Sequence, residues 1–183
     1  MEILDIVDEE GKPTGKTVER GYAHEQGILH RTSHVWILRK KEGQLQVLLQ
    51  KRSEGKDSYP GCYDISSAGH IPAGVDFIPS ALRELKEELD VSIKAEELSY
   101  CGQRRFSFET QFYGKRFKDN QVSNVYVLWL DREEAEFVLQ KEEVSRVHWF
   151  DFEACMQAVE KNEIPHCIFM EELKMVQAYA SGR

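Results

Sequence analysis

Residues 69–91 read GHIPAGVDFIPSALRELKEELDV, in which a glycine-bounded turn precedes a segment with helical spacing. A turn is predicted from Gly69 to Gly74 and a helix from Pro79 to Leu89. Proline suits the first turn of a helix because the amide hydrogen that it lacks has no helical partner there. Four aliphatic side chains share a stripe of roughly 60° on this helix, which predicts the face that docks on a sheet. They are Ile78, Leu82, Leu85 and Leu89.

Three glutamates occupy the neighbouring face of the same helix. Glu84, Glu87 and Glu88 fall within roughly 100° of one another, where like charges repel by a few tenths of a kcal/mol per pair. Acidic helix faces are most often solvated surface, so the charge pattern alone decides little. Gly69 changes this reading, because a glycine turn allows backbone carbonyls to point at a hard cation. Together they predict an oxygen cage for Mg²⁺ or Mn²⁺.

The spacing of this segment resembles the Nudix box, usually written G-x5-E-x7-R-E-U-x-E-E-x-G-U with U aliphatic. Gly69 is followed by thirteen residues and then by Arg83-Glu84-Leu85-x-Glu87-Glu88-x-x-Val91. Two positions depart from the box: Val75 replaces its first Glu, and Asp90 replaces its second Gly. Val75 puts the stability of the turn in doubt, and Asp90 must adopt a helix C-cap conformation.

A wider pattern resembles the Nudix branch related to isopentenyl-diphosphate isomerase, from about residue 3 to about residue 153. In that isomerase a catalytic Cys precedes the first Gly of the box, and here the position is Ala68, which can neither donate a proton nor attack. The stretch that best matches its downstream Glu-x-Glu pair, residues 122–125, contains no carboxylate. Hydrolysis is therefore favoured over isomerisation, although three matching histidines remain: His24, His30 and His70.

The resemblance implies roles for particular residues. Glu84, Glu87 and Glu88 would bind the cations together with the Ala68 carbonyl, and Glu84 could share in activating the water. Arg83 would orient Glu87, and Glu143 would serve as a further ligand or general base. The predicted substrate contacts are Lys51, Arg52, Gly69 and His70. The resemblance implies that His24 and His30 could bind a metal as in the isomerase, but a local hydrogen bond is the more common role of such loop histidines.

The remaining pattern predicts short strands and further helices around this segment. The predicted fold class is α/β, and the resemblance implies a Nudix-type α/β/α sandwich with a mixed central sheet, in a single domain over residues 1–183. Strands are expected at 3–7, 34–39, 45–50, 63–66, 98–108, 122–130 and 147–150, helices at 152–160 and 168–180, and loops at 53–61 and 111–121.

Composition limits the class of partner. The chain has 183 residues, and 32 acidic against 24 basic residues give a net charge of -8, which argues against binding to nucleic-acid phosphates. The four cysteines have no zinc-binding or disulfide spacing. No long apolar run or leader pattern is present, so we expect a cytoplasmic protein without membrane contact. A small-molecule diphosphate is the expected partner, and a homodimer is left open.

Three functions are compatible with these features. The leading one is a metal-dependent hydrolase that splits the phosphoanhydride of a nucleoside diphosphate linked to another moiety, or of a related organic diphosphate, by attack of water on phosphorus. The second is an isomerase of isoprenoid diphosphates, and the third is a non-catalytic domain that binds diphosphates.

Overall fold

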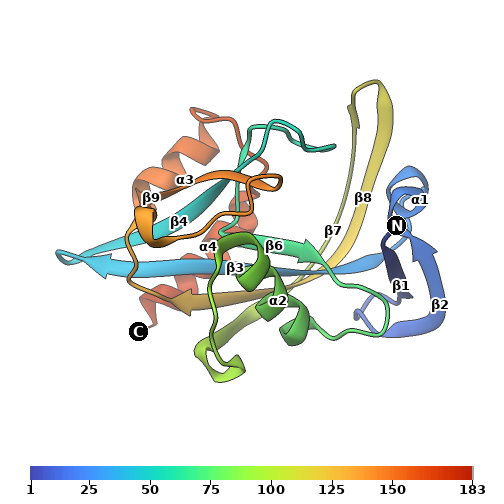
Figure 1. Cartoon of the computed structure of the whole chain (residues 1–183), viewed down its shortest axis with the longest axis horizontal. Coiled ribbons are helices and arrows are strands. Elements are labelled where there is room, and N and C mark those ends of the chain that lie inside the picture. Colours follow the sequence, from blue (N-terminus) through green and yellow to red (C-terminus); the bar gives the residue numbers. More distant parts are fainter. Residues whose placement is uncertain (183) are drawn as a thin grey trace.

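The computed structural model of the protein describes residues 1–182 (Figure 1). Within these residues, no helix is long and apolar enough to cross a membrane. The described elements are β1 (Ile3–Val7), β2 (Pro13–Glu19), α1 (Arg20–Gln26), β3 (His30–Lys41), β4 (Gln44–Arg52), β5 (Tyr63–Asp64), β6 (Ser67–His70), α2 (Phe77–Leu89), η1 (Ala95–Glu97), β7 (Leu98–Phe112), β8 (Lys115–Trp129), η2 (Glu134–Glu136), β9 (Val144–Asp151), α3 (Phe152–Glu160) and α4 (Met170–Ser181).

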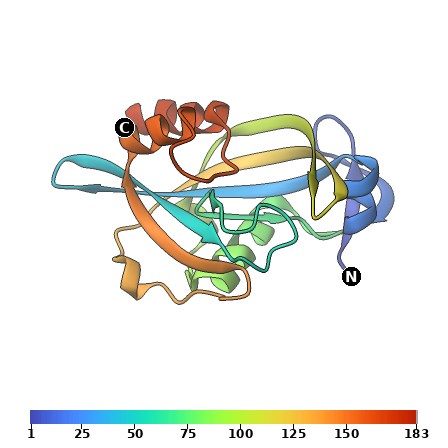
Figure 2. The same cartoon turned by 90° about the horizontal axis from the view of Figure 1, so that it is seen from above.

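A mixed sheet forms the middle layer of the molecule. Its strands follow the order β5-β4-β3-β8-β7, with β3 and β8 parallel, and β6 and β9 pair with β3 and β4. The first half of β3 pairs with β6 and its second half with β4, so the sheet divides between β6 and β4. Helix α2 covers one face, and α3 and α4 cover the other (Figure 2). The predicted α/β/α sandwich with a mixed sheet is confirmed.

Helix α2 docks through a face slightly rotated from the predicted stripe. Ala81, Leu85 and Leu89 are buried against side chains of β3 and β8. Ile78, predicted to share this face, is instead 37% exposed. The helix begins two residues earlier than predicted, because the Asp76 side chain caps the backbone N–H of Phe77. Pro79 therefore lies in the first turn, as expected.

The contribution of α2 to stability is testable at Leu85. Leu85 is fully buried, so Leu85→Ala removes apolar contacts and leaves a cavity, which we expect to lower the free energy of unfolding by about 2–5 kcal/mol. Urea denaturation measures this change. Leu82→Ala, on the same helix but only half-buried, is the matched control. An equal or larger loss for the control would contradict this docking.

The C-terminal end of α2 accommodates the residue that departs from the box. Asp90 has φ 55° and ψ 41°, and its backbone N–H donates to carbonyls of the last helical turn. This left-handed C-cap usually favours glycine, but Asp adopts it at modest cost. An ion pair between Lys86 and Asp90 also fixes the side chain. The predicted C-cap conformation of Asp90 is confirmed.

The predicted loop at residues 111–121 is wrong. Strands β7 and β8 extend through it and join at a tight turn formed by Tyr113 and Gly114, both with positive φ. The charged residues there hid the alternation of the two strands. Phe112 is the apolar residue at the end of β7, and Phe117 is the apolar residue near the start of β8. Glu109 and Arg116 form an ion pair near the turn. The resulting hairpin projects beyond the sheet, beside α1 (Figure 1).

Strand β2 and helix α1 were not predicted. The polar side chains of β2 are mostly exposed, so the strand lacks an apolar alternation. Helix α1 has only seven residues, is capped by the Glu19 side chain and ends at Gly27. It places His24 beside β8, which brings an N-terminal residue into the functional site.

Candidate functional site

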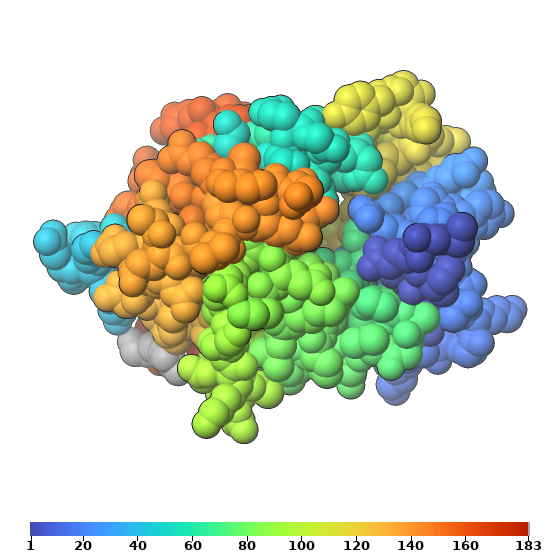
Figure 3. Space-filling model, viewed as in Figure 1, coloured from blue at the N-terminus to red at the C-terminus, as the bar shows by residue number. Residues whose placement is uncertain are grey.

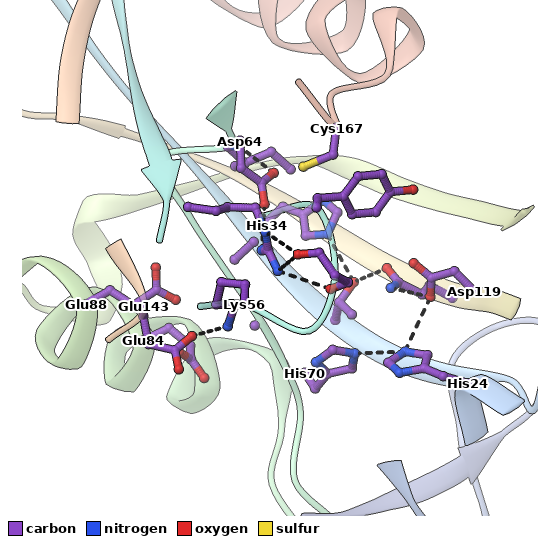
Figure 4. A pocket seen from close by; sticks show the side chains of 18 of the residues that line it. His24, His34, Lys56, Asp64, His70, Glu84, Glu88, Asp119, Glu143 and Cys167 are labelled. Carbon is purple, nitrogen blue, oxygen red and sulfur yellow. Dashed lines mark hydrogen bonds and ion pairs between the residues drawn. The ribbon is translucent and has the colours of Figure 1, made fainter. Parts of the chain in front are cut away.

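A cavity of about 330 Å³ opens among the box helix α2, the loop of residues 53–61, the β7–β8 hairpin and the N-terminal segment. Figure 3 shows its mouth as a hollow between the N-terminal segment, that loop and the segment that leads into β9. Two groups of potential metal ligands lie at the cavity (Figure 4). We call Glu84, Glu87 and Glu88 the carboxylate cluster, and His24, His30 and His70 the histidine cluster.

The carboxylate cluster contains one buried acid, Glu88, and a partly buried neighbour, Glu84. Glu88 is only 6% exposed and its Oε2 accepts a hydrogen bond of 2.6 Å from Gln50 Nε2. Burial, and then the neighbouring Glu84, raises the pKa of Glu88 well above its usual range, and burial also raises the pKa of Glu84. A divalent cation would relieve this repulsion, and oxygen ligands suit Mg²⁺ or Mn²⁺. Glu87, by contrast, has a half-exposed side chain.

Gly69 brings the cluster against the backbone of β6. A Cβ atom at this position would lie 2.5 Å from Glu84 Oε1, which no real contact tolerates. The absence of a side chain therefore lets the Glu84 carboxylate rest on the strand, next to Ala68, which also lines the cavity. The participation of the Ala68 carbonyl in cation binding stays a prediction.

Arg83 contacts Glu84 more closely than Glu87. Its Nη2 donates to Glu84 Oε1 at 2.8 Å, whereas Nη1 lies 4.0 Å from Glu87 Oε2. The predicted orientation of Glu87 by Arg83 therefore rests on the weaker of two ion pairs. Arg83 offsets charge mainly at the buried end of the cluster.

The turn that lacks the first glutamate of the box is held by other residues. Arg31 Nη2 donates to the Val75 carbonyl at 2.8 Å and to Asp5 Oδ2 at 3.0 Å. Asp5 Oδ2 in turn accepts from the Gly74 backbone N–H at 2.9 Å. A buried ion pair from β1 and β3 thus fixes the turn, which answers the doubt raised by Val75.

The predicted basic contacts divide between the two faces of β4. Lys51 is not among the described residues that line the cavity, because consecutive strand side chains point to opposite faces. Arg52 lines the cavity, but its guanidinium is held by the Ser58 carbonyl and by Asp64. Lys56 from the following loop also reaches the cavity and forms an ion pair with Glu143.

Glu143 lies where a late-loop carboxylate was predicted. Both it and Lys56 line the cavity, so the loop of residues 53–61 and the segment before β9 meet at its rim (Figure 4). His70 and Gly69, the two other predicted substrate contacts, also line the cavity.

The histidine cluster is a second potential cation site. One ring nitrogen from each of its three residues lies within 4.8 Å of the others, and the Nε2 atoms of His24 and His70 are 3.2 Å apart. Asp119 Oδ1 lies 3.7 Å from His24 Nε2 and 3.9 Å from His30 Nε2. The comparison with the isomerase found no carboxylate at residues 122–125, but Asp119 on the overlooked hairpin supplies one. Asp119 lies two residues after Phe117 on β8, and this spacing is the sequence signal that could have placed both side chains on one face of a strand.

The cluster residues have the protonation state that metal binding needs. Burial lowers the pKa of His24 to about 3 and of His30 to about 4, so both rings are neutral near pH 7. His30 Nδ1 faces the Ile28 carbonyl at 2.8 Å, which places the proton there and leaves a lone pair on Nε2. Within residues 1–182 this buried Nε2 has no hydrogen-bond partner. Nitrogen donors with one carboxylate suit Zn²⁺, Mn²⁺ or Co²⁺.

A metal titration tests the histidine cluster. His30→Asn removes one donor nitrogen and should weaken Zn²⁺ binding at least about ten-fold, as loss of a ligand does in other sites. Isothermal titration calorimetry in excess Mg²⁺ measures this affinity. His148→Asn, at a half-buried histidine of β9 outside the cluster, is the control. Equal affinity in His30→Asn and wild type would rule out binding at this cluster.

A mixed sheet between helical layers, with a glutamate-bearing helix at a cavity, defines a Nudix-type hydrolase fold. The NUDIX domain family matches residues 29–171, which is most of the chain. The chain belongs to this family, whose members act on nucleoside diphosphate derivatives and typically use divalent metal ions.

Relatives and solved structures agree with this assignment. The chain is 40% identical over 167 residues to Nudix hydrolase 3 of Arabidopsis thaliana, covering 88% of this chain but only 21% of the plant protein. It is 36% identical over 143 residues to an uncharacterised Nudix hydrolase of Clostridium acetobutylicum, covering 78% of this chain and 66% of the relative. The crystal structure of DR0079 from Deinococcus radiodurans has a TM-score of 0.69 at 21% identity, covering 94% of this chain and 98% of that one.

Proposed function

We propose that this protein is a divalent-cation-dependent hydrolase of organic diphosphates, in which water attacks phosphorus. The substrate class is a nucleoside diphosphate linked to another moiety, or a related diphosphate. The observation that carries the proposal is the pair of the buried Glu88 and the partly buried Glu84, whose carboxylate meets the β6 backbone at Gly69 beside a cavity.

The proposed site residues have distinct roles in hydrolysis. Glu84, Glu87, Glu88 and the Ala68 carbonyl would hold Mg²⁺ or Mn²⁺, which when bound neutralises diphosphate charge and acidifies a water molecule. Arg83 forms an ion pair with Glu84 that opposes the effect of burial on the pKa of this acid. Glu143 would accept the proton of the attacking water. Once its ion pair with Glu143 opens, Lys56 would be free to contact a phosphate oxygen.

Two structural neighbours support the choice of substrates for testing. A crystal structure of an Ap4A hydrolase from Caenorhabditis elegans has a TM-score of 0.56 at 20% identity, covering 84% of this chain and 98% of that one. The NUDIX domain of Shewanella oneidensis NrtR, solved with ADP ribose, has a TM-score of 0.59 at 16% identity, covering 82% and 87%. Both names refer to nucleoside phosphates linked to a second group, although these identities support the fold alone.

A second candidate activity is isomerisation of isopentenyl diphosphate. The histidine cluster with Asp119 favours it. Three histidines and a carboxylate resemble the site expected from the isomerase branch more fully than the sequence alone indicated. Ala68 opposes it, because no acid or nucleophile stands at the position of the catalytic cysteine. Hydrolysis is the better proposal, and we propose that it is carried out by one cytoplasmic domain over residues 1–183.

Hydrolysis in ¹⁸O-labelled water tests the proposal. Purified protein with Mg²⁺ or Mn²⁺ should convert ADP ribose, Ap4A or another linked diphosphate into products that carry the label on a phosphate oxygen. Mass spectrometry identifies the labelled product. Isopentenyl diphosphate is included in the panel, and its isomerisation without any labelled phosphate would replace the proposed hydrolysis with the second candidate.

A further inference from the structure

A chain of hydrogen bonds runs along the cavity from helix α4 to the histidine cluster. Glu172 Oε1 lies 2.8 Å from His34 Nδ1, and His34 Nε2 lies 3.1 Å from Thr32 Oγ1. Thr32 Oγ1 donates to Gln121 Oε1 at 3.0 Å, and Gln121 Nε2 donates to Asp119 Oδ1 at 2.6 Å. His34 and Asp119 are labelled in Figure 4, where dashed lines follow this route.

The donors and acceptors in this series of hydrogen bonds agree with one direction of donation between Thr32, Gln121 and Asp119. A carboxylate only accepts, so the Gln121 amide nitrogen must face Asp119 and its oxygen must face Thr32. The Thr32 hydroxyl then gives its proton to Gln121 and accepts from His34 Nε2. Burial alone would lower the pKa of His34, but the Glu172 carboxylate outweighs it and raises that pKa, which favours a ring that donates from both nitrogens.

The links are buried and their geometry is therefore restricted. Thr32, His34, Gln121 and Glu172 are each at most 7% exposed. Glu172 also accepts from Trp36 Nε1 at 2.7 Å and from an arginine of β7, so the start of the chain cannot rotate freely. In a low-dielectric interior, such a connected network stabilises one arrangement of its members.

The far end of the chain is the carboxylate oxygen that faces the histidine cluster. Asp119 Oδ1, which accepts from Gln121, is the same atom that lies 3.7 Å from His24 Nε2 and 3.9 Å from His30 Nε2. Rotation of Gln121 would release this oxygen. The hydrogen bond from Gln121 thus helps to orient Asp119 toward the cluster.

We propose that Glu172, His34, Thr32 and Gln121 are positioning residues that hold the Asp119 carboxylate toward His24 and His30. Helix α4 thereby sets the geometry of a divalent-cation site that it does not touch. This assignment rests on the cation binding described above for the histidine cluster, but it does not require a particular substrate or reaction. Outer residues that orient metal ligands commonly alter metal affinity when replaced.

Thr32 gives the sharpest test because it links the two halves of the chain. Thr32→Val replaces the hydroxyl with a methyl group of similar size, and Thr32→Ser keeps the hydroxyl. In a Co²⁺ titration followed by visible absorption in excess Mg²⁺, Thr32→Val should bind about ten-fold to a hundred-fold more weakly than wild type. Thr32→Ser should restore most of the affinity.

Ser33→Ala is the matched control. Ser33 follows Thr32 on β3 and is equally buried, but its hydroxyl donates to the Phe77 carbonyl at 2.7 Å and to no link of the chain. Its removal should leave Co²⁺ affinity within roughly three-fold of wild type. Equal losses in Thr32→Val and Ser33→Ala would assign the effect to general packing and overturn the proposal.

A crystal structure of metal-free Thr32→Val provides a readout independent of binding. Asp119 should turn away from His24 and His30 in that structure, and should keep its wild-type position in Thr32→Ser. The proposal is overturned if Asp119 does not move in Thr32→Val, or if wild-type protein takes up no Co²⁺ at the cluster. Failure to hydrolyse diphosphates would count against the proposed function only, since neither readout involves a substrate.

Discussion

Glu88→Gln should lower kcat for diphosphate hydrolysis by about 100-fold to 1,000-fold, the largest effect expected from a single substitution. The reason is that a cation contributes several kcal/mol to charge stabilisation in the transition state, and each 1.4 kcal/mol corresponds to ten-fold in rate. Glutamine cannot supply the negative charge that holds the ion. Initial rates at saturating substrate and Mg²⁺ measure the loss.

The same substitution should not unfold the protein. Burial raises the pKa of Glu88, so the folded chain disfavours the charged form that glutamine removes, and a glutamine oxygen can still accept from Gln50. The thermal midpoint should therefore equal or exceed that of wild type. Glu97→Gln, at an exposed glutamate of η1, is the control for both measurements. Full activity of Glu88→Gln would remove Glu88 from the proposed mechanism.

Gly69→Ala should give the second largest loss of activity, about 100-fold, although it adds a single methyl group. That group would lie 2.5 Å from Glu84 Oε1, too close for any real contact, so the carboxylate must leave the β6 backbone and the cation site loses its geometry. Mn²⁺ affinity, measured by electron paramagnetic resonance, should fall together with kcat.

The stability of Gly69→Ala separates a local from a global effect. The displaced group is the end of a flexible side chain and Gly69 has no left-handed backbone conformation, so little unfolding free energy should be lost. Gly74→Ala is an instructive comparison: a Cβ there meets nothing within 4 Å, but φ is +79°. We expect Gly74→Ala to lower stability and Gly69→Ala to lower activity. The reverse pattern would contradict the placement of Glu84.

The parts of the fold predicted correctly from sequence are those with a strong local signal. The box helix combines a proline, an apolar face and a glycine turn, and its position follows from them with an error of two residues at one end. The helix over residues 152–160 was predicted with its observed bounds. Ile78 was misplaced because the apolar spacing did not reveal that Glu88, an acid, lies on the buried face.

The resemblance to the isomerase branch singled out His24, His30 and His70, but their convergence with Asp119 could not be predicted because it depends on tertiary contacts. His24 lies on a short helix and Asp119 on a hairpin whose charged surface resembles a loop. The two residues meet because α1 packs beside β8. Gln50 and Lys56 illustrate the same limit, since their partners Glu88 and Glu143 are distant in sequence.

Anomalous diffraction from crystals soaked in Mn²⁺ tests the central claim most directly. We predict a manganese peak between Glu84, Glu88 and the backbone at Ala68 and Gly69, and its loss in Glu88→Gln. Manganese only among His24, His30, His70 and Asp119, or no bound manganese at either cluster, would contradict the assignment of the carboxylate cluster as the catalytic cation site.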